Sequence, residues 1–90
     1  MERTNEHVFY VLECADGSYY AGYTNDLTKR VNVHNSGKGA KYTRARRPVT
    51  CIYQEVFETK QLAMKAEYAF KQLKKSDKID YMANGMRGEQ

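Results

Sequence analysis

The chain has 90 residues, a mass of 10.5 kDa and a net charge of +4. This length fits one small domain over residues 1–90, with a core over about residues 7–84, and it excludes large substrate tunnels and dinucleotide-binding domains. The longest apolar run, Val8–Leu12, is far shorter than the ~20 residues of a membrane-spanning helix. Because the N-terminus has no apolar signal segment and the two cysteines form no CxxC pair, we expect a reduced, cytoplasmic protein without a zinc ribbon or disulfide scaffold.

Charge is distributed unevenly along the chain. Residues 1–26 contain five acidic side chains and one base, whereas residues 27–54 contain seven bases and no acid. Such a basic block attracts polyanions and releases their counterions on binding. The plain alternative is a solvated loop that keeps the domain soluble. Because solubility does not require the complete absence of acids, the pattern favours a polyanionic partner.

The first elements expected are two strands joined by a turn. Residues 7–14 and 18–23 are rich in β-branched and aromatic side chains, and the Ala-Asp-Gly between them is a turn signal. A two-residue turn would place Tyr10 and Tyr20 on opposite faces of the hairpin. A three-residue loop would pair Tyr10 with Gly22 and place both phenols on one face. A left-handed glycine at the third loop position suits the longer loop, so we predict a shared face.

A helix, a basic loop and a third strand are expected next. Asn25 or Asp26 can cap a helix that runs to about residue 35. The residues of this helix that share one face are Leu27, Arg30, Val31 and His34. Residues 36–48 form a basic, glycine-containing loop with room for one helical turn, and residues 49–57 are predicted to be a strand.

Two helices are expected to end the chain. Thr59 can cap a long helix to about Lys75, and Ser76 can cap a short last helix. The expected inward positions are Leu62, Ala66, Ala69, Phe70 and Leu73 in the long helix, and Ile79, Met82 and Ala83 in the last one. The order β-β-α-loop-β-α-α therefore predicts an α+β fold, in which helices flank a small three-stranded antiparallel sheet.

Four residue types supply the candidate chemistry. Tyr10 and Tyr20 can orient a water molecule or contact a phosphate oxygen, although tyrosine is also a common strand residue. Arg30 and His34 lie four residues apart on one helix face. They combine a fork of donors for a phosphate with a group that shuttles protons near neutral pH. The alternative is the polar edge of an ordinary amphipathic helix.

Glu67 lies on the flank of the long helix, with Lys71 and Lys74 beside it at i+4 and i+7. One interpretation is a surface Glu–Lys pair worth ~0.2–0.5 kcal/mol. The other is a single carboxylate that holds a divalent cation, with the lysines positioned for a polyanion. Mg²⁺ often takes only one or two carboxylates and keeps several waters, so one glutamate is enough for such a site.

Together these positions resemble the GIY-YIG nuclease superfamily, and in particular its small stand-alone bacterial members. The resemblance runs from about residue 8 to 78. Its first motif matches Val8–Tyr10 and its second matches Tyr20–Gly22. The family's helix arginine, frequent histidine and metal-binding glutamate match Arg30, His34 and Glu67. The stretch from Asn35 to Arg44 is typical of the stand-alone subfamily.

The resemblance implies a metal-dependent endonuclease that hydrolyses phosphodiester bonds in DNA, including structured or damaged DNA in repair or recombination. Glu67 would hold one Mg²⁺ or Mn²⁺ ion. Tyr10 or Tyr20 would orient or deprotonate the attacking water, Arg30 would neutralise the phosphate, and His34 would assist proton transfer or bind phosphate. A tyrosine with a pKa near 10 is a poor base at neutral pH, so Arg30 or a metal-bound water would have to lower that pKa.

The expected partner is DNA, with RNA left open, and the chain is expected to be a monomer or a weak homodimer without membrane contact. The side chains expected to contact nucleic acid are Lys38, Lys41, Arg44, Arg46, Arg47, Lys71 and Lys74. An alternative function is a nucleic-acid-binding or recruiting module with weak or no turnover, and a third is a protein-interaction domain. The basic block serves both nucleic-acid functions, so only metal-dependent cleavage separates them.

Overall fold

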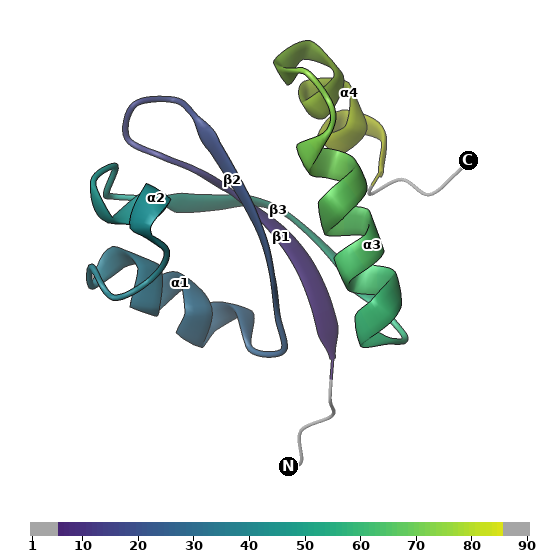
Figure 1. Cartoon of the computed structure of the whole chain (residues 1–90), viewed down its shortest axis with the longest axis horizontal. Coiled ribbons are helices and arrows are strands. Elements are labelled where there is room, and N and C mark those ends of the chain that lie inside the picture. Colours follow the sequence, from purple (N-terminus) through teal and green to yellow (C-terminus); the bar gives the residue numbers. More distant parts are fainter. Residues whose placement is uncertain (1–5, 86–90) are drawn as a thin grey trace.

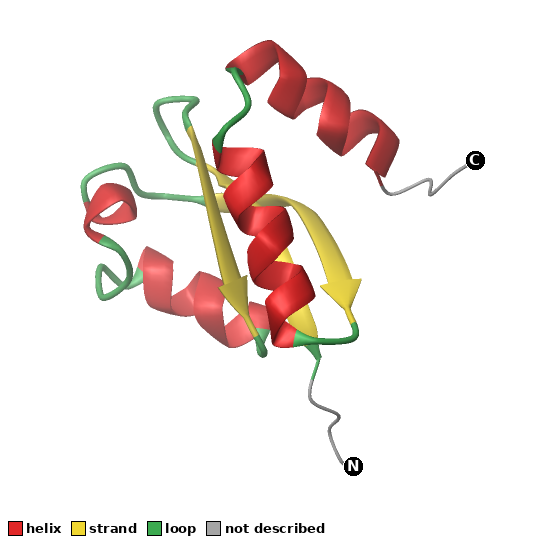
Figure 2. Ribbon diagram, turned by 45° about the vertical axis from the view of Figure 1, so that its right-hand side comes forward, coloured by secondary structure: helices red, strands yellow, loops and turns green. Residues whose placement is uncertain are grey.

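Three antiparallel strands form one sheet, and helices lie against both of its faces (Figures 1 and 2). The computed structural model describes residues 6–85. Its elements in chain order are β1 (His7–Glu13), β2 (Tyr19–Thr24), α1 (Leu27–Asn35), α2 (Lys41–Arg44), β3 (Thr50–Phe57), α3 (Lys60–Lys71) and α4 (Lys75–Gly85). The predicted α+β fold is confirmed, and the helical turn expected in the basic loop is α2. None of the helices within residues 6–85 is long and apolar enough to span a membrane.

The central strand β1 is covered on both faces, which explains its continuous apolar sequence. It lies between β2 and β3, and every residue of Val8–Leu12 is at most 3% exposed. Successive side chains of a strand point to opposite faces. The even-numbered ones pack with Val49 and residues of α1, whereas the odd-numbered ones pack with Phe70 of α3. In Figure 1, α1 and α2 accordingly lie on one side of the sheet and α3 on the other.

The hairpin register places the phenols of Tyr10 and Tyr20 on one face, as predicted. Tyr10 lies opposite Gly22, and Leu12 lies opposite Tyr20. Gly17 adopts a φ of +85°, a left-handed conformation that glycine enters without steric cost. The three-residue loop that this glycine completes therefore sets the register that brings the two phenols together.

Helix α1 begins after Asp26, whose carboxylate accepts a hydrogen bond from the Lys29 amide at 3.2 Å. Of the two predicted caps, the structure thus uses Asp26 rather than Asn25. The chain leaves the helix through Gly37, at a φ of +89°. Between these signals the helix presents His34, which is completely buried, toward the sheet.

The predicted boundary between the last two helices is wrong. Helix α3 ends at Lys71 rather than near Lys75, and α4 already begins at Lys75. Ser76 therefore lies inside α4 and does not cap it. The cap predicted for α3 is confirmed, because the Thr59 hydroxyl accepts from the Leu62 amide at 3.1 Å.

The inward face predicted for the long helix is confirmed at Ala66, Phe70 and Leu73, which belong to or pack against the core, and is wrong at two positions. Ala63 and Phe70, two turns apart, are buried, whereas Leu62 is 46% exposed and Ala69 is exposed. The hydrophobic pattern of this helix is ambiguous, since apolar residues occur on more than one flank. Contact of the Phe70 ring with Phe9, at 5.4 Å between centroids, determines which flank faces the sheet.

Helix α4 is oriented by a tyrosine rather than by its aliphatic residues. Ile79 is 47% exposed and Ala83 is exposed, so the prediction that they point inward is wrong. Tyr81 packs against the sheet together with Met82, and its hydroxyl donates to the Glu55 carboxylate at 2.9 Å. Ring contacts of Tyr81 with Phe9, Tyr53 and Phe70, together with one polar bond, thus fix a helix whose apolar periodicity is weak.

Candidate active site

Tyr10 and His34 meet in the interior between the sheet and α1. The Tyr10 hydroxyl lies 2.9 Å from Nε2 of His34, although 24 residues separate them in the chain. The other ring nitrogen of His34, Nδ1, lies 2.9 Å from the hydroxyl of Thr43 in α2. All three residues are at most 1% exposed. A continuous chain of polar groups therefore crosses an otherwise apolar core.

Two glycines give these rings the space to approach. A Cβ on Gly22 would lie 2.5 Å from the Tyr10 hydroxyl oxygen, so the phenol passes directly over the backbone of β2. A Cβ on Gly39 would collide with Nδ1 of His34 and lie 2.9 Å from its Cα. The Tyr10–His34 contact therefore requires glycine at two positions. These are Gly22, in the second sequence motif, and Gly39, in the basic loop.

Burial shifts both groups toward their neutral forms. It raises the pKa of Tyr10 to about 12, and the nearby Arg30 guanidinium only partly offsets this. For Tyr10, the lowered pKa that the sequence interpretation required is thus not found. Burial also lowers the pKa of His34, and the positive charge of Arg30 lowers it further. At neutral pH a protonated phenol therefore faces an uncharged imidazole.

Tyr20 lies against the same histidine. Its ring packs edge-on against His34 at 5.3 Å between centroids, and it stacks on Tyr42 at 6.1 Å. Tyr20 also lines a hollow of about 230 Å³ that is bordered by Lys71 and Lys78. Tyr20 thus links the buried pair to a half-open surface with two ammonium groups at its rim.

Arg30 and Glu67 approach the Tyr10 phenol from helices on opposite faces of the sheet. Both charges act on the Tyr10 pKa, which Arg30 lowers and Glu67 raises. This is compatible with the order β2-β1-β3, because β2 is an edge strand and the Tyr10 hydroxyl extends over it. Arg30 also lines a separate hollow of about 220 Å³ at the start of α1. Tyr20 and Arg30 therefore line different hollows, while the charges of Arg30 and Glu67 both influence the pKa of the same phenol.

Glu67 provides one carboxylate, paired with a lysine. Its side chain is 18% exposed, and Oε2 lies 2.8 Å from Nζ of Lys71. The Glu–Lys pair considered from the sequence therefore forms, although its carboxylate is largely buried. Within the part of the chain that the structure describes, no three His, Cys, Asp or Glu side chains gather as a metal cage. A hydrated Mg²⁺, which takes one or two carboxylates, fits this donor set.

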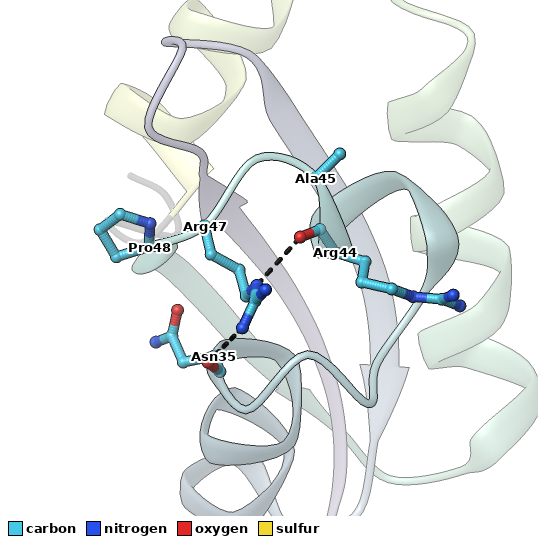
Figure 3. Close-up of a pocket in the computed structure, with 5 residues that line it drawn as sticks. All are labelled: Asn35, Arg44, Ala45, Arg47 and Pro48. Atoms are coloured by element: carbon cyan, nitrogen blue, oxygen red, sulfur yellow. Dashed lines mark hydrogen bonds between the residues drawn. The ribbon is translucent and has the colours of Figure 1, made fainter.

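The arginines of the basic loop differ in how they are held. Arg47 donates from Nε to the Arg44 carbonyl at 2.9 Å and from Nη1 to the Asn35 carbonyl at 3.4 Å (Figure 3). The second contact places a cation at the C-terminal end of α1, where the helix dipole favours it. A hollow of about 430 Å³ at this place is lined by Asn35, Arg44, Ala45, Arg47 and Pro48. Figure 3 shows the Arg44 side chain extending away from Arg47.

Arg46 is bonded into the fold as well. It contacts the Asp16 carboxylate at 3.1 Å and donates to the Tyr42 carbonyl at 3.0 Å. Its guanidinium also lies 3.9 Å from the centre of the Tyr42 ring. Arg46 thus ties the basic loop to the hairpin turn. The predicted nucleic-acid contacts that lie exposed are Lys38, Lys41, Arg44, Arg47, Lys71 and Lys74, whereas Arg46 is half-buried.

The sequence interpretation missed Thr43 and Gly39 as parts of the site. Both lie in the stretch that resembles the stand-alone subfamily, but this resemblance assigns them no role. A threonine in a basic loop is expected to be exposed, and nothing in its immediate neighbours predicts that it faces a histidine nine residues earlier. Only the packing of α2 against α1 brings Thr43 to His34.

Comparison with known proteins gives one family. The model of the GIY-YIG catalytic domain matches residues 6–80, a range that contains every residue of the candidate site. Among curated proteins, the chain is 61% identical over 79 residues to the UPF0213 protein YazA of Bacillus subtilis, covering 88% of this chain and 80% of that protein. It is 70% identical over 71 residues to a UPF0213 protein of Bacillus pumilus, covering 79% of this chain and 71% of the relative.

Two solved structures are similar to it. The solution NMR structure of a protein from E. faecalis superposes with a TM-score of 0.64 at 45% identity, covering 100% of this chain and 97% of that one. The solution NMR structure of a UPF0213 protein from Bacillus halodurans has a TM-score of 0.59 at 43% identity, covering 92% and 86%. Sequence and fold thus agree, and the chain belongs to the GIY-YIG catalytic domain family.

Proposed function

We propose that this protein is a metal-dependent endonuclease that hydrolyses phosphodiester bonds in DNA. The observation that carries the proposal is the buried contact between Tyr10 and His34, with Arg30 and Glu67 near the same phenol. A protonated phenol can pass its proton to an uncharged imidazole and take up another proton at the same time. Only the imidazole then becomes charged in the buried pair. Family membership supports a nuclease, and these groups can supply the proton transfer, the charge neutralisation and the metal binding for phosphodiester hydrolysis.

Tyr10 and His34 act together as the proton acceptor. As the attacking water forms its bond to phosphorus, its proton moves to the Tyr10 oxygen and the Tyr10 proton moves to Nε2 of His34. The phenol is restored and the imidazole becomes imidazolium. Because the pKa of Tyr10 is raised to about 12, a free phenolate is rare at neutral pH. Transfer through the pair removes the need for that phenolate.

Arg30 and Tyr20 act on the phosphate and the water. The Arg30 guanidinium stabilises the negative charge that builds up on the pentacovalent phosphorus, where a fixed cation is most effective. Tyr20, held edge-on against His34, orients the water or a phosphate oxygen through its hydroxyl.

Glu67 is the residue that would hold Mg²⁺ or Mn²⁺. When bound, the ion would stabilise negative charge on the leaving oxygen. Lys71 neutralises this carboxylate in the structure, so the lysine and a metal compete for it. With a metal ion on Glu67, the Lys71 ammonium group would be available to a DNA phosphate.

The exposed basic side chains of the loop and of α3 provide contacts to the DNA backbone. Lys38, Lys41 and Arg44 lie exposed on the α2 side of the molecule. Arg46 and Arg47 donate to carbonyls of the fold, so both hold the loop in place, and the exposed Arg47 can in addition contact a phosphate.

The decisive experiment is a cleavage assay on plasmid, single-stranded and branched DNA with Mg²⁺ or Mn²⁺. We expect Glu67→Gln to lower cleavage about 10²–10³-fold, the scale of one lost electrostatic group, while DNA binding persists. The matched control is Glu58→Gln, which removes an exposed glutamate just before α3 and leaves cleavage unchanged.

The alternative is a nucleic-acid-binding or recruiting module, and the same assay separates the two. If the wild-type protein binds DNA but cleaves none of these substrates with either metal, the binding module is correct and the endonuclease proposal fails.

A further inference from the structure

We propose that Thr43 is a positioning residue, which keeps the proton of neutral His34 on Nδ1 so that Nε2 stays unprotonated and receives the proton of Tyr10. The consequence for catalysis rests on the proposed function, whereas the tautomer of His34 is a property of the fold alone. A neutral imidazole has one donor and one acceptor nitrogen. Which nitrogen carries the proton is set by the partner of the other.

The first support comes from the Thr43 hydroxyl. It donates its single proton to the Ala40 carbonyl at 3.0 Å, and the same oxygen lies 2.9 Å from Nδ1 of His34. A hydroxyl has one proton and two lone pairs, so toward His34 it acts as an acceptor. His34 must then donate from Nδ1, and its Nε2 carries a lone pair.

The other end of the chain of groups is compatible with the same tautomer. The Tyr10 hydroxyl lies 2.9 Å from Nε2 of His34, and burial raises the pKa of Tyr10 to about 12. The phenol therefore keeps its proton at neutral pH and can donate it to a lone pair on Nε2.

The second support is steric. Gly39 leaves no room for a Cβ beside Nδ1 and Cα of His34, so the loop backbone fills that side of the ring. His34 is completely buried, as is Thr43, and water does not reach Nδ1 to replace the hydroxyl. Without Thr43 the ring would have no oxygen partner on that side. The proton would then move to Nε2, where it would donate to Tyr10 and block the transfer.

The test measures the tautomer directly. In protein labelled with ¹⁵N-histidine, the ring ¹⁵N shifts and their long-range couplings show which nitrogen is protonated at pH 8. The chain has two histidines, and His7 is an internal control, because its Nδ1 also contacts a phenol, Tyr23, at 2.9 Å. We expect the Nδ1–H form of His34 in the wild type, its loss in Thr43→Val, and its recovery in Thr43→Ser.

Cleavage is measured in parallel. Thr43→Val should lower the rate by about tenfold or more, the scale for losing a group that orients a functional histidine, and Thr43→Ser should restore most of it. Thr50→Val, at an exposed position of β3, is the control for the substitution itself and should change neither the His34 signals nor the rate.

Three results would overturn the inference: a wild-type His34 protonated on Nε2, an unchanged His34 tautomer in Thr43→Val, or a changed tautomer with unchanged cleavage. If Thr43→Val does not fold, the wild-type and Thr43→Ser spectra still decide the tautomer. If the wild type never cleaves DNA, the proposed function fails, but the ¹⁵N measurement still tests what Thr43 does to His34.

Discussion

The two faces of the sheet both bury tyrosines, but they use the phenol proton differently. On the face covered by α1, Tyr10 contacts the uncharged imidazole of His34. On the face covered by α3, Tyr53 and Tyr81 both donate to Oε1 of Glu55, at 2.8 and 2.9 Å. One phenol therefore faces a neutral acceptor, whereas two phenols share one carboxylate oxygen.

This difference separates a reactive phenol, Tyr10, from a structural clamp formed by Tyr53, Tyr81 and Glu55. Burial and the Glu55 carboxylate raise the pKa of Tyr81 to about 12, and they raise the pKa of Tyr53 as well. Both phenols are held in the protonated form, and the Tyr81 hydroxyl ties α4 to β3 through Glu55. Tyr10 is more deeply buried, at 1% exposed against 5% for Tyr53, but its neighbour His34 can become positively charged and is linked onward to Thr43. The burial of a tyrosine thus says little about its role until its acceptor is known.

The largest expected effect comes from removal of the Tyr10 hydroxyl, the reactive phenol in this comparison. Tyr10→Phe removes the hydroxyl that exchanges protons with His34 and should lower cleavage about 10²–10⁴-fold, the range of general acid–base catalysis. Tyr81→Phe removes a hydroxyl of the clamp and should lower the unfolding free energy by about 0.5–1.5 kcal/mol, with cleavage unchanged. Initial cleavage rates and urea unfolding of both variants check this. Equal losses of activity would show that the two faces do not differ.

A second prediction concerns the packing of α3 against the sheet. Phe70 is 2% exposed and contacts the Phe9 and Tyr81 rings. Phe70→Ala should therefore lower the unfolding free energy by about 3–5 kcal/mol, measured by urea denaturation. Tyr68→Ala, on the same helix but 69% exposed, is the control and should stay within about 0.5 kcal/mol of wild type. Similar losses in both would contradict the assigned helix orientation.

A third prediction concerns the space that the Tyr10 phenol needs beside Gly22, on the face covered by α1. In Gly22→Ala the new methyl would lie 2.5 Å from the Tyr10 hydroxyl oxygen, which should cost about 1–3 kcal/mol as an overpacked core does and also reduce cleavage. Gly17→Ala introduces strain at a φ of +85° but meets no atom within 4 Å. That control should cost about 1 kcal/mol without displacing the phenol. Unchanged cleavage in a folded Gly22→Ala protein would mean that the position of Tyr10 is not critical.

The smallest expected effect is a pH dependence of stability. The pKa of His34 is lowered in the folded state by burial and by Arg30, so the unfolded chain takes up a proton first as the pH falls. The contribution of neutral His34 is therefore complete above its unfolded pKa, about 6.5, and is lost as the pH falls toward the lower folded value. Urea unfolding of wild type and His34→Gln between pH 8 and pH 5 should show this loss in the wild type alone. A parallel decline in both proteins would contradict it.

Much of the fold could be predicted because its signals are local. The cap at Thr59, the helix between Asp26 and Gly37, and the three-residue turn at Gly17 depend on side chains within a few residues of one another. The end of α3 and the orientation of α4 could not be predicted. They depend on ring contacts and on the Tyr81–Glu55 bond, which joins residues 26 positions apart.

For the candidate site, the sequence by itself determined which chemical groups are present and that Tyr10 and Tyr20 share a face, because strand alternation and the turn length are properties of adjacent residues. Only the tertiary structure decided that Tyr10 meets His34, that its pKa rises rather than falls, and that Thr43 supports the imidazole. The physical reason is that burial and hydrogen-bond partners are set by surfaces brought together in packing. Two glycines without a Cβ, at positions 22 and 39, allow those surfaces to meet.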